Sequence, residues 1–139
     1  MSPLAASELA GLIDERSDAE VNEAVAAAGT DALLKRAFAT MGASFLAEAA
    51  AGEQAVVQWD VATPDGPRSW QVTVADGAAS VAAGTVGTAR VTLGVDMADL
   101  LRFLAGRLDG MQAFLSGRLR VSGDLMVAQA MQAWFAPVV

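Results

Sequence analysis

The chain has 139 residues, which suits one domain, and it has neither a basic leader nor an apolar run of about 18 residues, so we expect a cytoplasmic protein. It contains no histidine, cysteine or tyrosine, which excludes disulfide bonds and thiolate chemistry and removes the commonest general base and zinc ligand. The 16 acidic and 9 basic residues give a net charge of −7, which argues against a nucleic-acid partner, because sequence-independent binding of nucleic acid needs clustered Lys and Arg.

The first two predicted helices lie in an acidic stretch, since residues 1–53 carry nine acidic side chains against three basic ones. Ser2 and Pro3 have the residue types of an N-cap and a first helical position, and apolar residues follow at helical spacing. Ser17 and Glu20 form a capping box for the second helix, and Gly29 stands where a C-cap glycine belongs.

A third helix is predicted from Thr30 or Asp31 to about Ala51. Its large apolar residues recur on one face, and we expect Phe38 and Phe45 to join a core between this helix and a sheet. We therefore divide the single domain into an N-terminal helical region, residues 1–51, and a region with the sheet and the remaining helices, residues 52–139.

From Ala55 the apolar period changes to two, which indicates strands. Thr63–Pro67 and Asp76–Gly77 have the composition of turns between them. Arg118 and Arg120 would share one face of the last strand, where they could hold an anionic group or pair with the acidic helices. The alternation predicts five strands, over residues 55–62, 70–75, 79–83, 89–95 and 118–121.

Asp96, Asp109 and Asp124 each precede a predicted helix, over about 97–105, 110–115 and 125–135. Together with Asp99 they could be interpreted as acid pairs for catalysis, but N-capping explains three of the four positions. Helices first, then mainly antiparallel strands, then further helices predict an α+β fold. In it, a five-stranded, mostly antiparallel sheet is covered on one face by helices, with extra helices at the N-terminus.

Other motifs give weak signals. Gly84 and Gly87 could suggest a phosphate loop, but the stretch lies between two strands and lacks the Lys-Ser/Thr pair. Lys35, beside Arg36, is interpreted as a surface residue, not as a Schiff-base lysine. No carboxylate spacing is typical of a metal site. We therefore predict no metal, no cofactor and no catalytic residue, and expect a protein that is not an enzyme.

The late helices hold more large, flexible apolar side chains than a single buried face needs. From Leu125 to Phe135 there is no charge, and Gln129 and Gln132 are the only polar side chains. Two interpretations remain open at this point. These residues form ordinary core, which periodicity alone favours, or they form the wall of a ligand cavity.

The region from Gly52 to Phe135 resembles the sterol carrier protein 2 family, also called the SCP2 sterol-binding domain. The resemblance is most specific in the stretch QAFLSGRLRVSGD, residues 112–124. The other matching segments keep the family's order along the chain: Thr88–Leu93, Asp99–Leu101, Gly106–Arg107 and Ala128–Gln132.

This resemblance implies an apolar tunnel between sheet and helices that binds a sterol, fatty acid, acyl-CoA or similar lipid without covalent chemistry. Gln129 and Gln132, three residues apart on one helix surface, could supply its few polar contacts or lie exposed on the outside. The predicted apolar wall consists of Met97, Leu101, Leu104, Phe114, Met126, Met131, Trp134 and Phe135.

The departures from the family pattern bear on partners and location. Ala130 stands where lysine is common, so we expect membrane contact to be transient at most. The chain ends in Pro137–Val139 and not in a Ser-Lys-Leu type of peroxisomal address, which favours a stand-alone, bacterial-type carrier. Two alternatives remain: an accessory protein or cyclase that shapes a hydrophobic intermediate, and a protein-interaction module without a ligand. The oligomeric state is not predicted.

Overall fold

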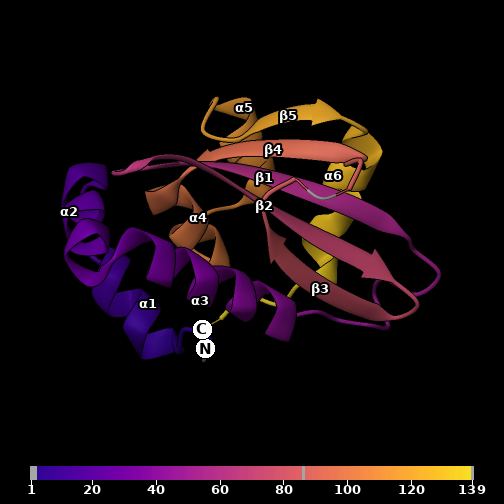
Figure 1. Cartoon of the computed structure of the whole chain (residues 1–139), viewed down its shortest axis with the longest axis horizontal. Coiled ribbons are helices and arrows are strands. Elements are labelled where there is room, and N and C mark those ends of the chain that lie inside the picture. Colours follow the sequence, from indigo (N-terminus) through magenta and orange to yellow (C-terminus); the bar gives the residue numbers. More distant parts are fainter. Residues whose placement is uncertain (1–2, 86, 139) are drawn as a thin grey trace.

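The computed structural model describes residues 3–85 and 87–138, which form a five-stranded mixed sheet with helices (Figure 1). The strand order is β3-β2-β1-β4-β5. The pair β1–β4 is parallel and the other three pairs are antiparallel, so the predicted α+β fold with a mostly antiparallel five-stranded sheet is confirmed. The strands are β1 (Ala55–Thr63), β2 (Gly66–Ala75), β3 (Ala78–Ala83), β4 (Val91–Asp96) and β5 (Arg120–Gly123).

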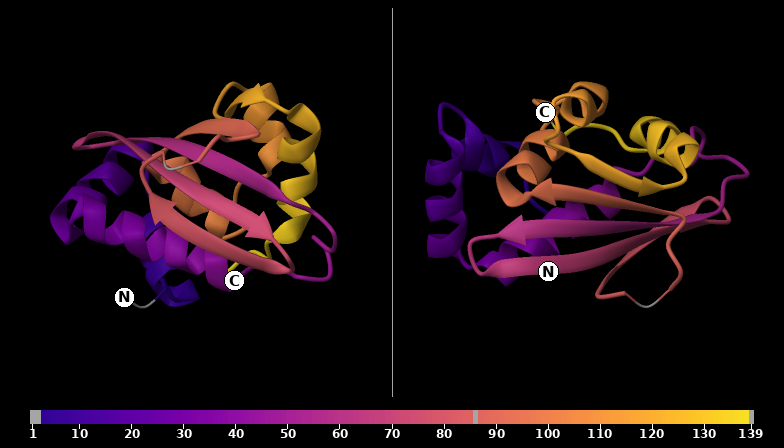
Figure 2. Two further views of the ribbon diagram at one scale, coloured as in Figure 1. Left: turned by 45° about the vertical axis from the view of Figure 1, so that its right-hand side comes forward. Right: turned by 90° about the horizontal axis from the view of Figure 1, so that it is seen from above.

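The helices cover the face of the sheet that carries Trp59 and Trp70. Phe38 of the third helix stacks on Trp70 and meets Trp59 edge-on, and Phe103 of the fourth packs against Trp59. Figure 2 shows the first two helices at one end of the molecule and the last two on the same side of the sheet, near β5. The helices are α1 (Ala6–Ile13), α2 (Asp18–Ala28), α3 (Thr30–Ala43), α4 (Met97–Leu104), α5 (Gly110–Leu115) and α6 (Leu125–Met131), followed by a 3-10 turn, Gln132–Trp134.

The opposite face of the sheet carries a polar network. The side-chain amide of Gln58 donates to Asp60, at 3.0 Å. Gln71, which is only 2% exposed, donates to the carbonyl of Gly87 and accepts a hydrogen bond from its N–H. The loop around Gly87 is thereby held against this face, and no helix is needed to cover Gln71.

Local capping signals identify several helix ends correctly. Ser17 and Glu20 form the predicted capping box of α2, and Gly29 ends that helix with φ of 101°. Asp109 accepts the backbone N–H of Gln112 at the start of α5. Asp124 accepts the N–H groups of Met126 and Val127 at the start of α6. These two carboxylates therefore serve as helix caps, as predicted, whereas Asp96 stands at the N-cap position of α4 but its side chain makes no capping hydrogen bond.

Two helices are shorter than predicted, for the same physical reason. The helix predicted to reach Ala51 ends at Ala43, and the final helix ends at Met131. The N–H of Leu46 donates to the carbonyl of Trp134, at 2.6 Å, and Phe45 pairs with Phe135 in an isolated β-bridge. Backbone pairing between these two segments replaces the helical hydrogen bonds, and the Phe45 and Phe135 rings lie 5.6 Å apart.

Further boundaries differ from the prediction. β2 begins at Gly66 and not at residue 70, because Thr63 and Gly66 already pair across the hairpin and only residues 64–65 turn, and β4 begins at Val91 and not at residue 89. α1 begins at Ala6 with Ala5 as its N-cap; of the predicted start, Ser2 lies outside the described residues. β5 begins at Arg120, so Arg118 lies before the strand and does not share a strand face with Arg120. Arg118 instead donates to Asp99, at 2.8 Å.

Candidate functional site

Three hollows meet around Gly110, the first residue of α5. The outer hollow has a volume of about 290 Å³ and lies between α3, α4, the turn before α5 and the C-terminal segment. The inner hollow, about 10 Å³, lies beneath α5 against the sheet. The α5–α6 hollow, about 20 Å³, lies between those two helices and β5. Gly110 lines all three hollows.

Shared side chains join these hollows in pairs. Phe103 and Leu108 line both the outer and the inner hollow. Leu119 lines the inner and the α5–α6 hollow, and Gln132 lines the outer and the α5–α6 hollow. These few side chains are therefore the partitions between neighbouring hollows.

Gln132 forms the wall between two of the hollows by packing on Gly110. An added Cβ at Gly110 would lie 2.6 Å from both Cδ and Oε1 of Gln132. Any side chain at position 110 would have to displace this amide. A glycine is therefore needed for the observed position of Gln132.

The inner hollow contains the ring of Trp59 in its wall, and this ring carries a buried polar group. Trp59 is 1% exposed, and within the described residues its Nε1–H has no hydrogen-bond acceptor. Leaving such a donor unpaired costs about 1–3 kcal/mol. The other lining side chains are apolar, so a water there would find few of the polar partners that it needs. The surface of the hollow itself is apolar, so it fits an apolar group.

The structure distributes the ten predicted ligand-binding residues over several environments. Leu104 and Phe135 line the outer hollow, Phe114 and Gln129 line the α5–α6 hollow, and Gln132 lines both. Four others are buried and line none of the three hollows described here: Met97, Leu101, Met131 and Trp134. Met126 is 79% exposed. Their assignment to a ligand stays a prediction.

Sequence reasoning did not single out several residues around Gly110. Trp59 in β1 and Val95 in β4 belong to the apolar residues that occupy every second position of their strands. This pattern places both on the covered face of the sheet, but it does not show that a hollow lies there. Phe103 belongs to the large apolar side chains of the late helices and Leu119 alternates with the arginines of the predicted last strand, but neither pattern marks a hollow, and Leu108 carries no local signal. Their meeting depends on how α4, α5 and β5 pack together.

A buried ion-pair network supports the segment that carries α5. Asp99 of α4, whose side chain is 3% exposed, accepts hydrogen bonds from Arg102 and Arg118. Arg102 also pairs with Asp18 of α2 and donates to the carbonyl of Arg16. Burial by itself lowers the pKa of Arg102, but hydrogen bonds to Asp18 and Asp99 outweigh it and the pKa is raised above its ordinary value. Arg118 is therefore engaged with α4 and does not pair with the acidic N-terminal helices.

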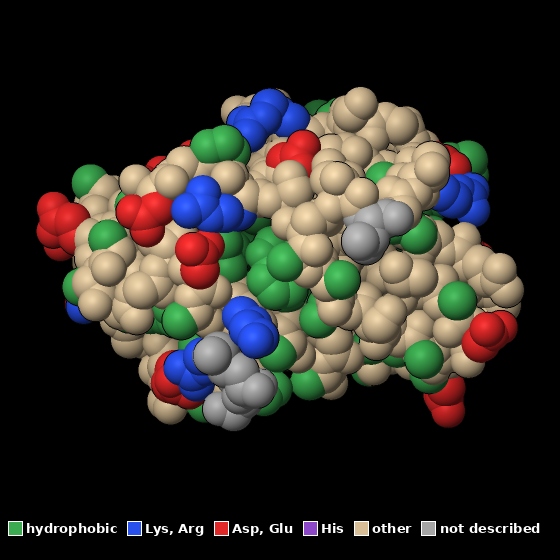
Figure 3. All heavy atoms as spheres, in the orientation of Figure 1, with side chains coloured by type: hydrophobic (Ala, Val, Ile, Leu, Met, Phe, Trp, Pro, Cys, Tyr) green, Lys and Arg blue, Asp and Glu red, His purple; other side chains and the backbone are tan. Residues whose placement is uncertain are grey.

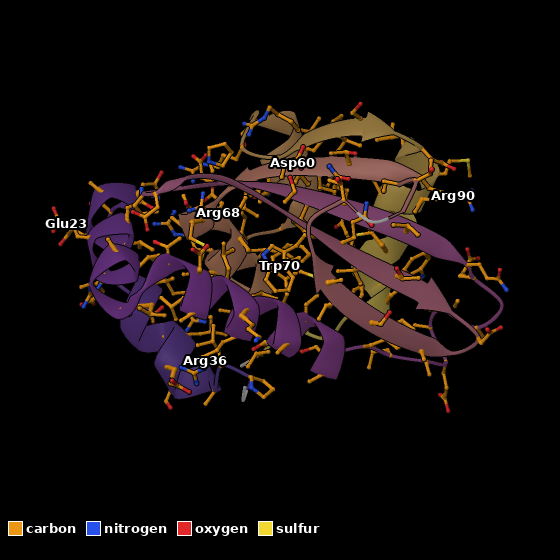
Figure 4. All side chains as sticks on the ribbon, in the orientation of Figure 1. Glu23, Arg36, Asp60, Arg68, Trp70 and Arg90 are labelled. Atoms are coloured by element: carbon orange, nitrogen blue, oxygen red, sulfur yellow. The ribbon has the colours of Figure 1, made fainter. Side chains whose placement is uncertain are left out.

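A second, open groove of about 700 Å³ lies between α3 and the β2–β3 pair. Figure 3 shows a hollowed apolar area on this face, flanked by basic and acidic side chains, and Figure 4 labels Trp70 and Arg68 beside α3. Arg68 donates to Asp31 at 2.9 Å, and Lys35 also lines the groove. No sequence pattern indicates this groove, because α3 and β3 meet only in the folded chain.

Across residues 3–85 and 87–138, no three His, Cys, Asp or Glu side chains come together in a way that could hold a metal ion. Within the same ranges, none of the helices has the length and apolar character required to cross a membrane.

Comparison with known protein families shows that this chain matches a described family. The model described as the SCP-2 sterol transfer family matches residues 34–136. The match covers more than half of the chain and includes α4, α5, β5, α6 and every residue that lines the three hollows except Pro137.

A curated relative and several solved structures show the same similarity. The peroxisomal multifunctional enzyme type 2 of mouse is 33% identical over 81 residues, or 56% of this chain; the chain spans only 11% of that enzyme. Sterol Carrier Protein 2 Like 2 from Aedes aegypti gives a TM-score of 0.59 at 21% identity, covering 75% of this chain and 97% of that one. The palmitated form of the mosquito protein gives 0.53 at 23% identity, covering 67% and 88%.

The fold also occurs within a larger enzyme. The sec-alkylsulfatase Pisa1 from Pseudomonas gives a TM-score of 0.60 at 19% identity, covering 68% of this chain and 15% of the sulfatase chain. At these levels of identity the solved structures show a common fold, and the activity of the sulfatase belongs to that protein.

Proposed function

The chain belongs to the SCP-2 sterol transfer family, and on this premise we propose that it binds a hydrophobic small molecule, without covalent chemistry, in the hollows around Gly110. Lipid binding or transfer is the function that this family implies. One observation supports this choice of site: three hollows, largely lined by apolar side chains, meet at Gly110. Sterols, fatty acids and acyl-CoA all remain candidate ligands, and the palmitated mosquito protein makes a fatty acid the first to try.

The sizes of the hollows indicate how such a ligand would enter. The outer hollow, about 290 Å³, is near the lower end of the roughly 300–1,000 Å³ typical of ligand pockets. The two smaller hollows hold no more than about one water each. We propose that a ligand displaces Gln132 from Gly110 and moves α5, which lies between Gly106 and Gly117, both with positive φ.

Simple energetics support binding with few polar contacts. Burying about 400 Å² of apolar ligand surface at roughly 25 cal/mol per Å² contributes ~10 kcal/mol before the costs of association. Because the hydrophobic effect has no directional requirement, ligands of different shape but similar apolar area would bind. We therefore propose a carrier of broad specificity.

We propose carriage and not catalysis. Asp109 is the carboxylate that lines the outer hollow, and it is already used to accept the N–H of Gln112. A measured turnover that is abolished by Asp109→Asn would favour an enzyme instead. The expectation of a stand-alone, bacterial-type carrier in the cytoplasm also stays a prediction.

The proposal can be tested by filling the site. Leu108 is half-buried and lines both the outer and the inner hollow, so Leu108→Trp should lower the affinity for a fluorescent 16-carbon fatty acid by about tenfold or more. Leu12→Trp is the matched control, because Leu12 is half-buried on α1 and lines none of the three hollows. Equal affinities of the two variants would contradict binding at this site.

A further inference from the structure

Two arginines flank α5, the short helix that begins at Gly110. Arg107 directly follows Gly106 and Arg118 directly follows Gly117, and both glycines have positive φ. A helix of six residues is too short to be stable by itself. Contacts with the rest of the protein must therefore hold α5 in place, and these two arginines supply some of them.

The arginine before α5 is held by α1. Arg107 meets Asp14, the residue that ends α1, through two contacts: Nε lies 2.7 Å from Oδ1, and Nη2 lies 3.1 Å from Oδ2. Such a bidentate pair fixes the direction of the guanidinium group as well as its distance. The side chains of Arg107 and Asp14 are 43% and 42% exposed, so water and salt can reach the pair.

The arginine after α5 is connected to α2 through a chain of ion pairs. Arg118 donates to the buried carboxylate of Asp99, at 2.8 Å, and Arg102 donates to the same oxygen, at 3.1 Å. Arg102 also pairs with Asp18, the first residue of α2, and donates to the carbonyl of Arg16 just before that helix. Since Asp99 and Arg102 belong to α4, the N-terminal helices reach one end of α5 directly and the other end through α4.

Helices α1 and α2 lie outside the part of the chain that matches the family model, which begins at residue 34. Both helices pack against α4, and Figure 1 shows them beside α4 at one end of the molecule. Arg102, Arg107 and Arg118 lie inside the matched region, whereas Asp14 and Asp18 precede it. The ion pairs therefore connect two helices outside the matched region to the segment that covers the hollows.

From these contacts we propose that α1 and α2 form a brace that holds α5 closed over the hollows and thereby sets the rate at which a ligand enters. The proposal rests on the proposed function, in which a ligand moves α5. That movement carries Arg107 away from Asp14 and Arg118 away from Asp99, so both pairs break in the open form. Only the open fraction of the protein is competent to bind, so the brace slows ligand entry. Asp14 and Asp18 are thus positioning residues, which act through the arginines and not on the ligand.

The test is the rate at which a fluorescent fatty acid binds to the full chain, followed by stopped-flow fluorescence. Asp14→Asn should raise the association rate constant about two- to fivefold, the factor expected for the loss of one half-exposed ion pair. The dissociation rate constant should be unchanged, because this pair is already broken in the bound form. Asp31→Asn is the matched control, since it also removes one carboxylate from an ion pair, but that pair joins α3 to Arg68 of β2.

A charge swap separates the ion pair from other effects of the substitutions. Asp14→Arg alone places two positive charges opposite each other and should speed association further. Combining it with Arg107→Asp restores a pair of opposite charges and should return the rate toward that of the wild type. A double variant that binds as fast as Asp14→Arg alone would overturn the proposal.

Salt should act on the same pair. Screening weakens the attraction between half-exposed charges, so added sodium chloride should speed association to the wild type more than to Asp14→Asn. The Asp31→Asn control has the same net charge as Asp14→Asn and keeps the brace, so it should respond to salt as the wild type does. Equal responses of all three proteins would contradict an electrostatic brace.

Hydrogen exchange of the ligand-free protein tests the brace without a ligand. The amides of α5 should exchange faster in Asp14→Asn than in the wild type or in Asp31→Asn, because local opening exposes them. Fatty-acid binding with equal association rates and equal α5 exchange in the three proteins would overturn the brace and leave the proposed function intact. Faster α5 exchange in Asp14→Asn, with no fatty-acid binding by any of them, would contradict the proposed function alone.

Discussion

Two features of single residues mark the hollows around Gly110: the buried indole N–H of Trp59 and the contact of Gln132 with Gly110. Capping residues such as Ser17 and Asp124 are predictable from sequence, because a helix cap depends on residues within a few positions. The unpaired Nε1–H of Trp59 and the contact between Gln132 and Gly110 are not, since each depends on residues brought together from different elements. The chemistry of the site therefore becomes visible only in the folded chain.

Trp59→Phe tests the role of the indole N–H. If a bound ligand accepts a hydrogen bond from it, the variant should lose about three- to tenfold in affinity for hexadecanol, the range expected for one hydrogen bond. Its affinity for hexadecane, which has no acceptor, should change less. Competition against a fluorescent fatty acid measures both affinities. An equal loss for the two compounds would show that Trp59 contributes only apolar surface.

Gly123 provides a prediction about stability at a single residue. Its φ is 106°, and an added Cβ would lie 2.6 Å from the backbone carbonyl oxygen of Arg90, which cannot move aside as a side chain can. Gly123→Ala should therefore lower the free energy of unfolding by about 2 kcal/mol or more. Gly11→Ala on α1, where nothing lies within 4 Å, should raise it by about 0.5–1 kcal/mol. Urea unfolding compares the two, and a harmless Gly123→Ala would contradict the close approach of β4 and β5.

At the scale of elements, the sequence predicts which segments form helices and strands better than where they end. The strand alternation and the capping residues are local, and they identify β1 to β5 and α2 to α6. The early end of α3 has a distant cause, because the hydrogen bond between Leu46 and Trp134 joins segments 88 positions apart. No periodicity within residues 44–51 could indicate that pairing.

The start of α6 should depend on pH through Asp124. Hydrogen bonds from Val127 N–H and from Arg90 hold the pKa of this carboxyl below its ordinary value of 3.8. Its contribution to stability is therefore present above that value and is lost as the pH falls through the lower, folded-state pKa. Asn at this position caps a helix equally well but does not titrate.

The measurement is the free energy of unfolding of the wild type and of Asp124→Asn, followed from about pH 7 to about pH 2. We expect the wild type to be the more stable at neutral pH, because only it keeps the ion pair with Arg90. The difference should hold down to about pH 5 and shrink below 3.8. A difference that stays constant to the lowest pH would show that Asp124 is not perturbed by folding.

For the whole molecule, the resemblance to a known family predicts more than the residue patterns do alone. It implies the five-stranded sheet and an apolar site, and the family match confirms the family. The hollows themselves could not be predicted, because they are defined by how closely α4, α5, α6 and the C-terminal segment pack. Met97 and Leu101 of α4 illustrate this. Both are large and apolar, as the wall of a lipid site requires, but both are fully buried.

The most direct test of the central claim is an NMR titration of the isotopically labelled protein with palmitate. The account predicts the largest changes in the backbone signals of Gly110, Ala113 and Gln132, around which the three hollows meet. Changes confined to Trp70, Lys35 and Val81 would place the ligand in the open groove beside α3. That result, or the absence of any saturable change, would contradict a ligand site around Gly110.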